Sequence, residues 1–240
     1  MPKHNPETLE SVISHHRPNA TNNIQIAPIP TGKFNDSYFV LADNEPLVLR
    51  IAPPRNAVFC FYEKDMMRQE PDIHLLLQKK TDVPVATIYA YNDSLTLINH
   101  DYMLMERLPG APLTDVQGAD HNHVLRQVGR HLAQTHALTA PTYGYIGAHH
   151  PMDPATTWVD AFEHMWNRLI DDIVSVGHYN GEESQFLRTL LDKHLPLFNH
   201  SVTSRLLHMD IWHQNILITP DGSVTGIVDW DRALWGGPRN

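Results

Sequence analysis

Two polar segments, each set against a run of β-branched residues, constrain this chain more than any other feature. In the first, Asp210 precedes Asn215 by five residues, and apolar residues flank the segment on both sides. In the second, Asp229 ends the run Gly226-Ile227-Val228, 14 residues after Asn215. Pro220-Asp221-Gly222 lies between the two segments, and this turn sequence predicts a β-hairpin. A hairpin of that length would return Asp229 to the side of Asn215.

These three side chains suggest a particular chemistry. The carboxylate of Asp229 and the carboxamide of Asn215 are oxygen ligands that suit Mg²⁺, a cation that also binds substrate phosphates. Asp210 lies on the loop before the hairpin, where its carboxylate can accept the proton of a nearby hydroxyl group. The alternative is a plain polar loop, because Asp and Asn are common turn residues. The two segments together favour a metal-dependent site.

Composition narrows the classes of protein that remain. The chain of 240 residues can bury a sizeable core, and its 18 basic and 27 acidic residues give a formal charge of −9. No basic cluster is present, which argues against a nucleic-acid partner. There is neither an apolar leader nor a run of about 18 apolar residues, so no signal peptide and no membrane partner are expected. Cys60 is the single cysteine, which favours a reducing, cytoplasmic setting.

Strand patterns come first along the chain and helix patterns follow. Periodicity predicts a helix at 7–16, strands at 24–29, 37–42, 46–51, 83–91 and 94–105, and a helix at 59–80 that Pro71 interrupts. Further helices are expected at 121–138, 157–176 and 182–197, before the hairpin. Runs of strands followed by runs of helices indicate an α+β fold with two lobes. We expect an N-terminal lobe at 1–104, a hinge at 105–110 and a C-terminal lobe at 111–240.

With these patterns in view, the sequence resembles a known family. His208-Met209-Asp210-Ile211-Trp212-His213-Gln214-Asn215, followed by Ile227-Val228-Asp229, is similar to the aminoglycoside phosphotransferase family of small-molecule kinases, which share the protein-kinase-like fold. Val48-Leu49-Arg50-Ile51 resembles the strand that supplies a basic residue to the nucleotide phosphates in that family. Tyr102–Gly110 resembles its hinge, and the likeness covers roughly residues 25–237.

The resemblance implies a role for the residues that match. Asp210 would accept the proton of the acceptor hydroxyl, while Asn215 and Asp229 would hold Mg²⁺ on ATP or GTP. Arg50 would contact the phosphates and pair with Glu70, since a buried arginine needs a carboxylate partner. Without the resemblance, a charged residue on a strand is usually a solvated edge, and Glu70 could lie on the polar face of an amphipathic helix.

The resemblance also implies backbone contacts to the nucleotide. Backbone N–H groups near Asn35, Asp36 and Ser37, beside Gly32-Lys33, would cover the phosphates, although a plain hairpin turn is the alternative there. Backbone groups of Glu106 and Leu108 would face the nucleobase. His208 would be structural, with hydrogen bonds to the backbone around the loop that carries Asp210.

The end of the sequence departs from the family pattern. Gly237 stands where the family usually has an aspartate, and 11 residues follow Asp229. We therefore expect either that the chain is a truncated form or that part of the acceptor site is missing. We also expect an exposed apolar surface around Trp230 and Trp235 that permits self-association. A catalytically silent, nucleotide-binding fragment of the pseudokinase kind is then the alternative to an active small-molecule kinase.

The acceptor is left open by the sequence. Residues 110–200 contain ten acidic and five basic side chains, and an acidic lobe would attract a cationic acceptor such as an amino-alcohol. Such an excess is also typical of solvated helix faces. The acceptor is therefore expected to be a small molecule with a hydroxyl group, and a positive charge on it is one option.

Overall fold

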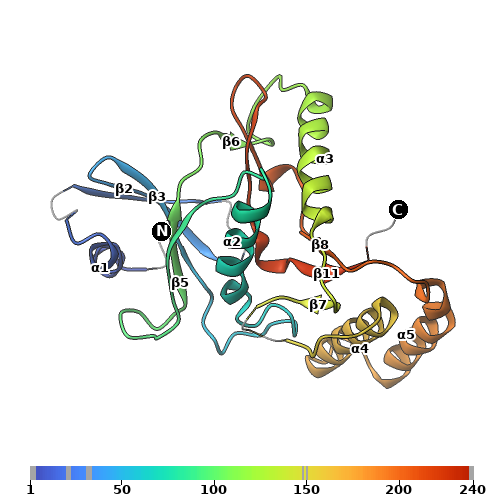
Figure 1. Cartoon of the computed structure of the whole chain (residues 1–240). Coiled ribbons are helices and arrows are strands. Elements are labelled where there is room, and N and C mark those ends of the chain that lie inside the picture. Colours follow the sequence, from blue (N-terminus) through green and yellow to red (C-terminus); the bar gives the residue numbers. More distant parts are fainter. Residues whose placement is uncertain (1–3, 20–22, 31–33, 148, 150, 238–240) are drawn as a thin grey trace.

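The N-terminal part is built on a five-stranded antiparallel sheet with the strand order β1-β2-β3-β5-β4 (Figure 1). The computed structural model describes residues 4–19, 23–30, 34–147, 149 and 151–237. The strands are β1 (Ile24–Pro28), β2 (Asp36–Ala42), β3 (Glu45–Ile51), β4 (Ile88–Asn92) and β5 (Tyr102–Glu106). The predicted meander is present in β1 to β3, and Asp43 and Asn44 turn the chain between β2 and β3 with positive φ angles.

The two faces of this sheet have different neighbours. Tyr38, Val40 and Ala42 of β2 are buried in a cluster with helix α1 (Pro6–His16), which covers one face of the sheet. Because side chains alternate along a strand, Ser37 and Phe39 lie on the opposite face. Both line a cavity between the sheet and the C-terminal part. The alternation in β2 therefore separates the core face from the cavity face.

The helix predicted at 59–80 begins at Glu70 instead. Helix α2 spans Glu70–Lys80 and follows a 3₁₀ turn, η1 (Met66–Gln69). Pro71 lies in its first turn, where the missing N–H is not needed and the fixed φ suits a helix. The prediction was wrong because Pro71 marks the beginning of the helix and does not interrupt it. Residues 61–65 form turns, and Asp65 has a φ of +57°.

The strands predicted at 83–91 and 94–105 were too long. β4 and β5 are joined by residues 93–101 and not by a two-residue turn. Before β4, the Pro84 carbonyl oxygen accepts the N–H of Ile227 at 2.9 Å, so this segment packs on the C-terminal hairpin. After β4, Asn92 Oδ1 accepts the N–H of Ser94 at 3.1 Å. Such local side-chain bonds compete with the strand ladder and hold a loop.

Three helices dominate the C-terminal part: α3 (His121–Ala137), α4 (Trp158–Ser175) and α5 (Gly181–His194). α5 ends earlier than predicted, in the 3₁₀ turn η2 (Leu195–Phe198). The predicted hairpin is confirmed, because β9 (Ile216–Ile218) pairs with β10 (Val224–Ile227), and β6 (Ala111–Pro112) extends that sheet. In the part of the chain that is described, no helix has both the length and the apolar character of a membrane span.

The core near Trp230 is closed by a second small sheet. β11 (Leu234–Gly236) lies between β7 (Gly144–Tyr145) and β8 (Arg205–Leu207). Trp230 begins the 3₁₀ turn η4 (Trp230–Arg232) and is fully buried, and its indole N–H donates to the Ile227 carbonyl oxygen at 2.8 Å. Trp235 is half-buried against the same cluster. The expected exposed surface around these tryptophans was therefore wrong, and it gives no basis for self-association.

Gly237 has a packing reason of its own. A Cβ atom at this position would lie 2.6 Å from Val202 Cγ2 and 3.0 Å from the ring of Trp158. There is consequently no room for the aspartate of the family pattern. Exposed apolar side chains lie instead along α4 and α5, among them Trp166, Phe186 and Leu190.

Together these parts form the two-lobed α+β fold that the sequence predicts (Figure 1). The chain passes from one part to the other through Leu108-Pro109-Gly110. Gly110 has a φ of +99°, and a Cβ atom there would lie 2.5 Å from the Ile218 carbonyl oxygen, so only glycine fits this turn. The domain boundaries at 104/105 and 110/111 stay a prediction.

Candidate functional site

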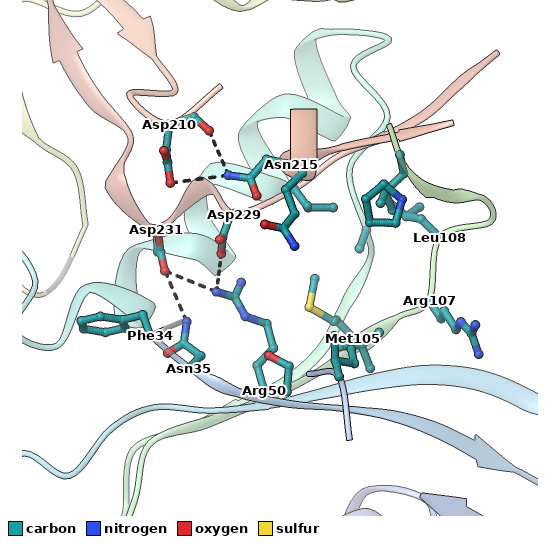
Figure 2. Close-up of a pocket in the computed structure, with 18 of the residues that line it drawn as sticks. Phe34, Asn35, Arg50, Met105, Arg107, Leu108, Asp210, Asn215, Asp229 and Asp231 are labelled. Carbon is teal, nitrogen blue, oxygen red and sulfur yellow. Dashed lines mark hydrogen bonds and ion pairs between the residues drawn. The ribbon is translucent and has the colours of Figure 1, made fainter. Parts of the chain in front are cut away.

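A cavity of about 310 Å³ lies between the inner face of the sheet and the β9–β10 hairpin (Figure 2). This volume is in the range of small-molecule sites. In this view Met105, Arg107 and Leu108 lie on the right, and Arg50, Asp210, Asp229 and Asp231 lie to the left of them. The polar lining residues are Asn35, Ser37, Arg50, Glu106, Arg107, Asp210, Gln214, Asn215, Asp229, Asp231 and Arg232. One cavity therefore contains an apolar slot, lined by Met105 and Leu108, and a cluster of charged groups around Arg50.

His208 holds the backbone of Asp210 in place. The His208 Nδ1 accepts the Asp210 N–H at 3.2 Å, and its Nε2–H donates to the Val228 carbonyl oxygen at 3.0 Å. Both bonds require the neutral ring with its proton on Nε2, and burial lowers the pKa of His208 to about 4. Met209 between them has a φ of +68°, a strained conformation for this residue. The backbone bonds expected of His208 are thus present.

Asn215 lies at the beginning of the hairpin, beside Asp210. Its Nδ2 donates to the Asp210 carbonyl oxygen at 2.9 Å and lies 3.5 Å from Asp210 Oδ2. This arrangement leaves the Asn215 Oδ1 available to a cation. Asp229 follows β10 with a φ of +69°, and its carboxylate is partly exposed to the cavity. The hairpin therefore brings all three motif residues to one cavity (Figure 2).

Arg50 is the centre of the polar cluster. Its Nη1 donates to both carboxylate oxygens of Glu70 at 2.7 Å, and its Nη2 lies 2.6 Å from Asp229 Oδ1 and 3.3 Å from Asp231 Oδ2. Arg50 and Glu70 are both buried, so neither lies on a solvated surface. Burial alone would lower the pKa of Arg50, but these carboxylates together raise it well above its ordinary value. Arg50 is therefore permanently charged.

Asp231 belongs to this cluster although the sequence analysis missed it. Its Oδ2 lies 3.4 Å from Asn35 Nδ2, and its backbone oxygen accepts a hydrogen bond from the side chain of Gln69. Burial, followed by the negative charges of Asp229 and Glu70, raises the pKa of Asp231. The only signal in the sequence was a second acid two residues after Asp229. That spacing could not show that η4 turns the side chain toward Arg50.

The apolar end of the cavity adjoins the predicted hinge. The Glu106 N–H donates to the Thr87 carbonyl oxygen at 2.8 Å, and the Arg107 N–H donates to the Pro46 carbonyl oxygen at 3.2 Å. These two N–H groups are therefore committed to neighbouring segments. Leu108 also lines the cavity, and its N–H is not used in this way in the described part of the chain. Leu108 is thus placed to offer a backbone donor to a planar base.

Some predicted positions stand outside this arrangement. The Asp36 carboxylate lies 3.4 Å from His4 Nε2 and is not part of the cavity lining. Glu70 reaches the cavity only through Arg50. Gly32-Lys33 lie outside the described residues, so the phosphate-covering turn stays a prediction, while Asn35 and Ser37 at its described end do line the cavity.

The residues present fit a Mg²⁺ ion that is bound together with phosphates. Asn215 and Asp229 supply one carboxamide and one carboxylate oxygen, and Mg²⁺ commonly takes few protein ligands and completes its shell with water and phosphate oxygens. Within the described ranges, no three His, Cys, Asp or Glu side chains are grouped to hold a metal ion.

A second group that sequence reasoning missed lies beside Asp210. Arg232 Nη1 is 3.7 Å from Asp210 Oδ2, and Arg232 Nη2 is 3.1 Å from Glu63 Oε1. The guanidinium carbon is 5.9 Å from the centre of the Tyr62 ring. Tyr62 and Glu63 belong to the connection between β3 and α2. The helix predicted at 59–80 included them, but they form turns.

Comparisons with known proteins agree with this fold. Residues 25–239 match the phosphotransferase enzyme family. The crystal structure of aminoglycoside phosphotransferase APH(4)-Ia superposes with a TM-score of 0.68 at 17% identity, over 97% of this chain and 73% of that one. A thermostable mutant of that protein, crystallised with AMP-PNP and hygromycin B, gives 0.65 at 16%, over 94% and 73%. A putative fructosamine-3-kinase from Haemophilus somnus gives 0.63 at 19%, over 95% and 73%. No curated protein matches the sequence.

Proposed function

Because this chain belongs to the phosphotransferase enzyme family, we propose that it transfers the γ-phosphoryl group of ATP or GTP to a hydroxyl group of a small molecule. The observation that carries this proposal is the meeting of Asp210, Asn215 and Asp229 with Arg50 in one cavity. A solved relative that holds AMP-PNP and hygromycin B together supports a cavity shared by nucleotide and acceptor.

The proposed step needs a group that receives a proton. The Asp210 carboxylate accepts the proton of the acceptor hydroxyl as the hydroxyl oxygen bonds to the γ-phosphorus. The bond from the γ-phosphorus to the bridging oxygen breaks, and ADP or GDP leaves. His208 and Asn215 both hold the Asp210 backbone, so the carboxylate is positioned before the acceptor arrives.

The remaining residues bind and orient the nucleotide in this proposal. Arg50 contacts the phosphates while Glu70 keeps its guanidinium in place. Asn215 and Asp229 would hold Mg²⁺, and the ion would neutralise charge on the phosphates. Asp229 Oδ1 is paired with Arg50 here, so Arg50 must share or release it when Mg-nucleotide binds. The base lies in the apolar slot near Leu108.

Binding and turnover test the proposal separately. Thermal-shift titrations with Mg-ATP and Mg-GTP measure nucleotide binding, and release of ADP or GDP across a panel of hydroxyl compounds measures transfer. We expect stabilisation by at least one nucleotide and release that depends on an acceptor. Stabilisation without release would favour the catalytically silent alternative. An unchanged melting temperature with both nucleotides would contradict the active kinase and the catalytically silent nucleotide-binding protein alike.

A further inference from the structure

The connection between β3 and α2 reaches from the nucleotide side of Asp210 to its far side. We call residues 59–63 of this connection the arch. At its beginning, the Phe59 ring lies 5.6 Å from the ring of Phe34, close to the turn before β2. At its end, Glu63 is 3.1 Å from Arg232 of η4. The arch therefore links Phe34, which precedes β2, to the side chains around Asp210.

Three contacts fix the arch on the C-terminal part. The Phe61 N–H donates to Asp172 Oδ2 of α4 at 2.6 Å. The guanidinium of Arg168, also on α4, lies 5.3 Å from the centre of the Phe61 ring. The Tyr62 ring stacks on Tyr145 of β7, with centroids 5.7 Å apart and planes at 3°. A hydrogen bond, a cation–π contact and a stacked pair give the arch one defined position.

Arg232 lies between the arch and Asp210. One of its terminal nitrogens pairs with Glu63 and the other lies 3.7 Å from Asp210 Oδ2. The side chains of Arg232 and Asp210 are 31% and 34% exposed, so a small molecule can reach both. A compound whose hydroxyl meets Asp210 from this side lies next to Arg232, which in turn contacts Glu63 and the Tyr62 ring.

The charged groups of the arch and of its neighbours on α4 and η4 are already paired within the protein. We call this surface the wall. Glu63 Oε1 accepts from Arg232, and Glu63 Oε2 accepts the Cys60 N–H at 3.2 Å. Asp172 accepts the Phe61 N–H. A polycationic acceptor requires carboxylates that are free to neutralise it, whereas neutral hydroxyl groups can share hydrogen bonds with paired groups. The wall suits a neutral acceptor better than a polycation.

Other acidic residues of the C-terminal part serve its helices. Asp120 caps α3, and Glu183 completes the capping box of α5 together with the neutral Asn180. Asp171 of α4 pairs with Arg188 of α5 at 2.6 Å. Such positions favour acidic side chains for local reasons. The acidic excess that suggested a cationic acceptor is therefore explained in part by helix capping and pairing away from Asp210.

We propose that the arch and Arg232 form the acceptor site, and that the acceptor is an uncharged polyhydroxy compound of the size of a sugar. This inference rests on the proposed function. One hydroxyl of the acceptor gives its proton to Asp210 as described above, and neighbouring hydroxyls bond to Glu63 and Arg232. The carbon skeleton lies against Tyr62, so an apolar surface and a few polar groups together fix its orientation.

Acceptor kinetics with arch variants test the assignment. The 240-residue chain is assayed for ADP or GDP release with neutral hexoses, pentoses and inositols, and with aminoglycosides as polycations. Glu63→Gln keeps the shape of the side chain but cannot accept from both Arg232 and Cys60, so we expect the acceptor KM to rise about fivefold. Tyr62→Leu should raise it about tenfold. The nucleotide KM should change less than about twofold in both variants.

Two distant variants serve as matched controls. Glu182→Gln lies in the first turn of α5, and Tyr89→Leu lies on β4, where the side chain is 43% exposed. Neither should change the acceptor KM or the nucleotide KM. Melting curves establish that each variant is folded, and Glu63→Gln alone decides the test if Tyr62→Leu does not fold.

Each outcome of the assay has a defined meaning. Transfer to a neutral compound, with a raised acceptor KM in the arch variants and a constant nucleotide KM, supports the proposal. Transfer to aminoglycosides alone would overturn it and leave the proposed kinase activity intact. A folded Glu63→Gln variant with an unchanged acceptor KM would overturn it too. No release with any acceptor would count against both the proposed function and this site.

Discussion

The two sides of Asp210 are built in different ways. On the nucleotide side, Arg50 is buried and gathers three carboxylates within 3.3 Å of its guanidinium nitrogens. On the far side, Arg232 is 31% exposed and joins only two carboxylates of the described residues, at 3.1 and 3.7 Å. Both sides place an arginine among acids. They differ in burial and in how tightly the charges are held.

The difference in burial predicts which property each substitution will change. Buried charges that lose their partner destabilise the whole fold, because no water replaces the missing contact. Half-exposed charges can be rearranged at little cost to folding, so they are suited to select a substrate. We expect variants on the nucleotide side to affect stability and nucleotide binding, and variants on the far side to affect the acceptor.

The largest effect is expected where the two sides meet. Asp210→Asn removes the group proposed to accept the proton and keeps the size of the side chain. We expect kcat to fall by about 10²–10⁴-fold while the thermal shift with Mg-nucleotide is retained. Steady-state release of ADP or GDP measures the first quantity and a melting titration the second. Turnover at the wild-type rate would remove Asp210 from its proposed role.

Arg50→Ala tests the nucleotide side itself. The substitution leaves Glu70 and Asp231 buried without their cation, and we expect the free energy of unfolding to fall by about 3–5 kcal/mol. Urea denaturation measures this change. Arg17→Ala is the matched control, because Arg17 pairs with Glu45 at 2.8 Å on a more exposed surface. There we expect a loss of about 1 kcal/mol or less. Equal losses of stability in the two variants would show that the burial of Arg50 does not make its ion pairs more important for folding.

The loop that joins the two sides should make the stability of the fold depend on pH, because His208 is buried in its neutral form. Burial lowers the pKa of His208 to about 4, below its ordinary value of 6.5. Between these values the unfolded chain binds the proton and the folded chain does not. The contribution of His208 is therefore complete above pH 6.5 and is lost as the pH falls toward 4. We expect this residue to account for roughly 2–3 kcal/mol of the acid loss.

Denaturation at several pH values checks this expectation. Burial lowers the pKa of His74 as well, so the wild-type slope contains more than one histidine. His208→Asn should reduce the pH dependence of the unfolding free energy between pH 6.5 and 4 by an amount that corresponds to the uptake of up to one proton on unfolding. An identical slope in the variant and the wild type would show that His208 does not stay neutral in the folded protein.

The smallest effect is expected at an acidic residue away from the cavity. Asp171→Asn breaks the pair with Arg188 on the α4–α5 surface, where the Asp171 side chain is 63% exposed. We expect a change in stability of about 1 kcal/mol or less and no change in the KM of any acceptor. A raised KM for a cationic acceptor would show that the acidic excess of α4 and α5 does attract the substrate.

Local patterns were enough to predict the hairpin and the residues it carries. Asn215 and Asp229 come together because a turn sequence joins two short β-branched runs, and the outcome depends on neighbours in the sequence. The meander β1–β3 follows from the same kind of signal. Helix α2 shows the limit of local reasoning, since Pro71 was compatible with an interruption as well as with a beginning.

The order of the elements, the two-lobed α+β fold and the spacing of the three motif residues can all be predicted from local sequence patterns. That Asp231 joins Arg50, that Trp230 is buried and that the arch lies beside Asp210 follows only from the packing of distant segments. Glu63 and Arg232 are 169 residues apart, and Asn35 and Asp231 are 196 apart. Contacts at such separations depend on how all the intervening elements pack together, and no periodicity or turn signal in one segment encodes them.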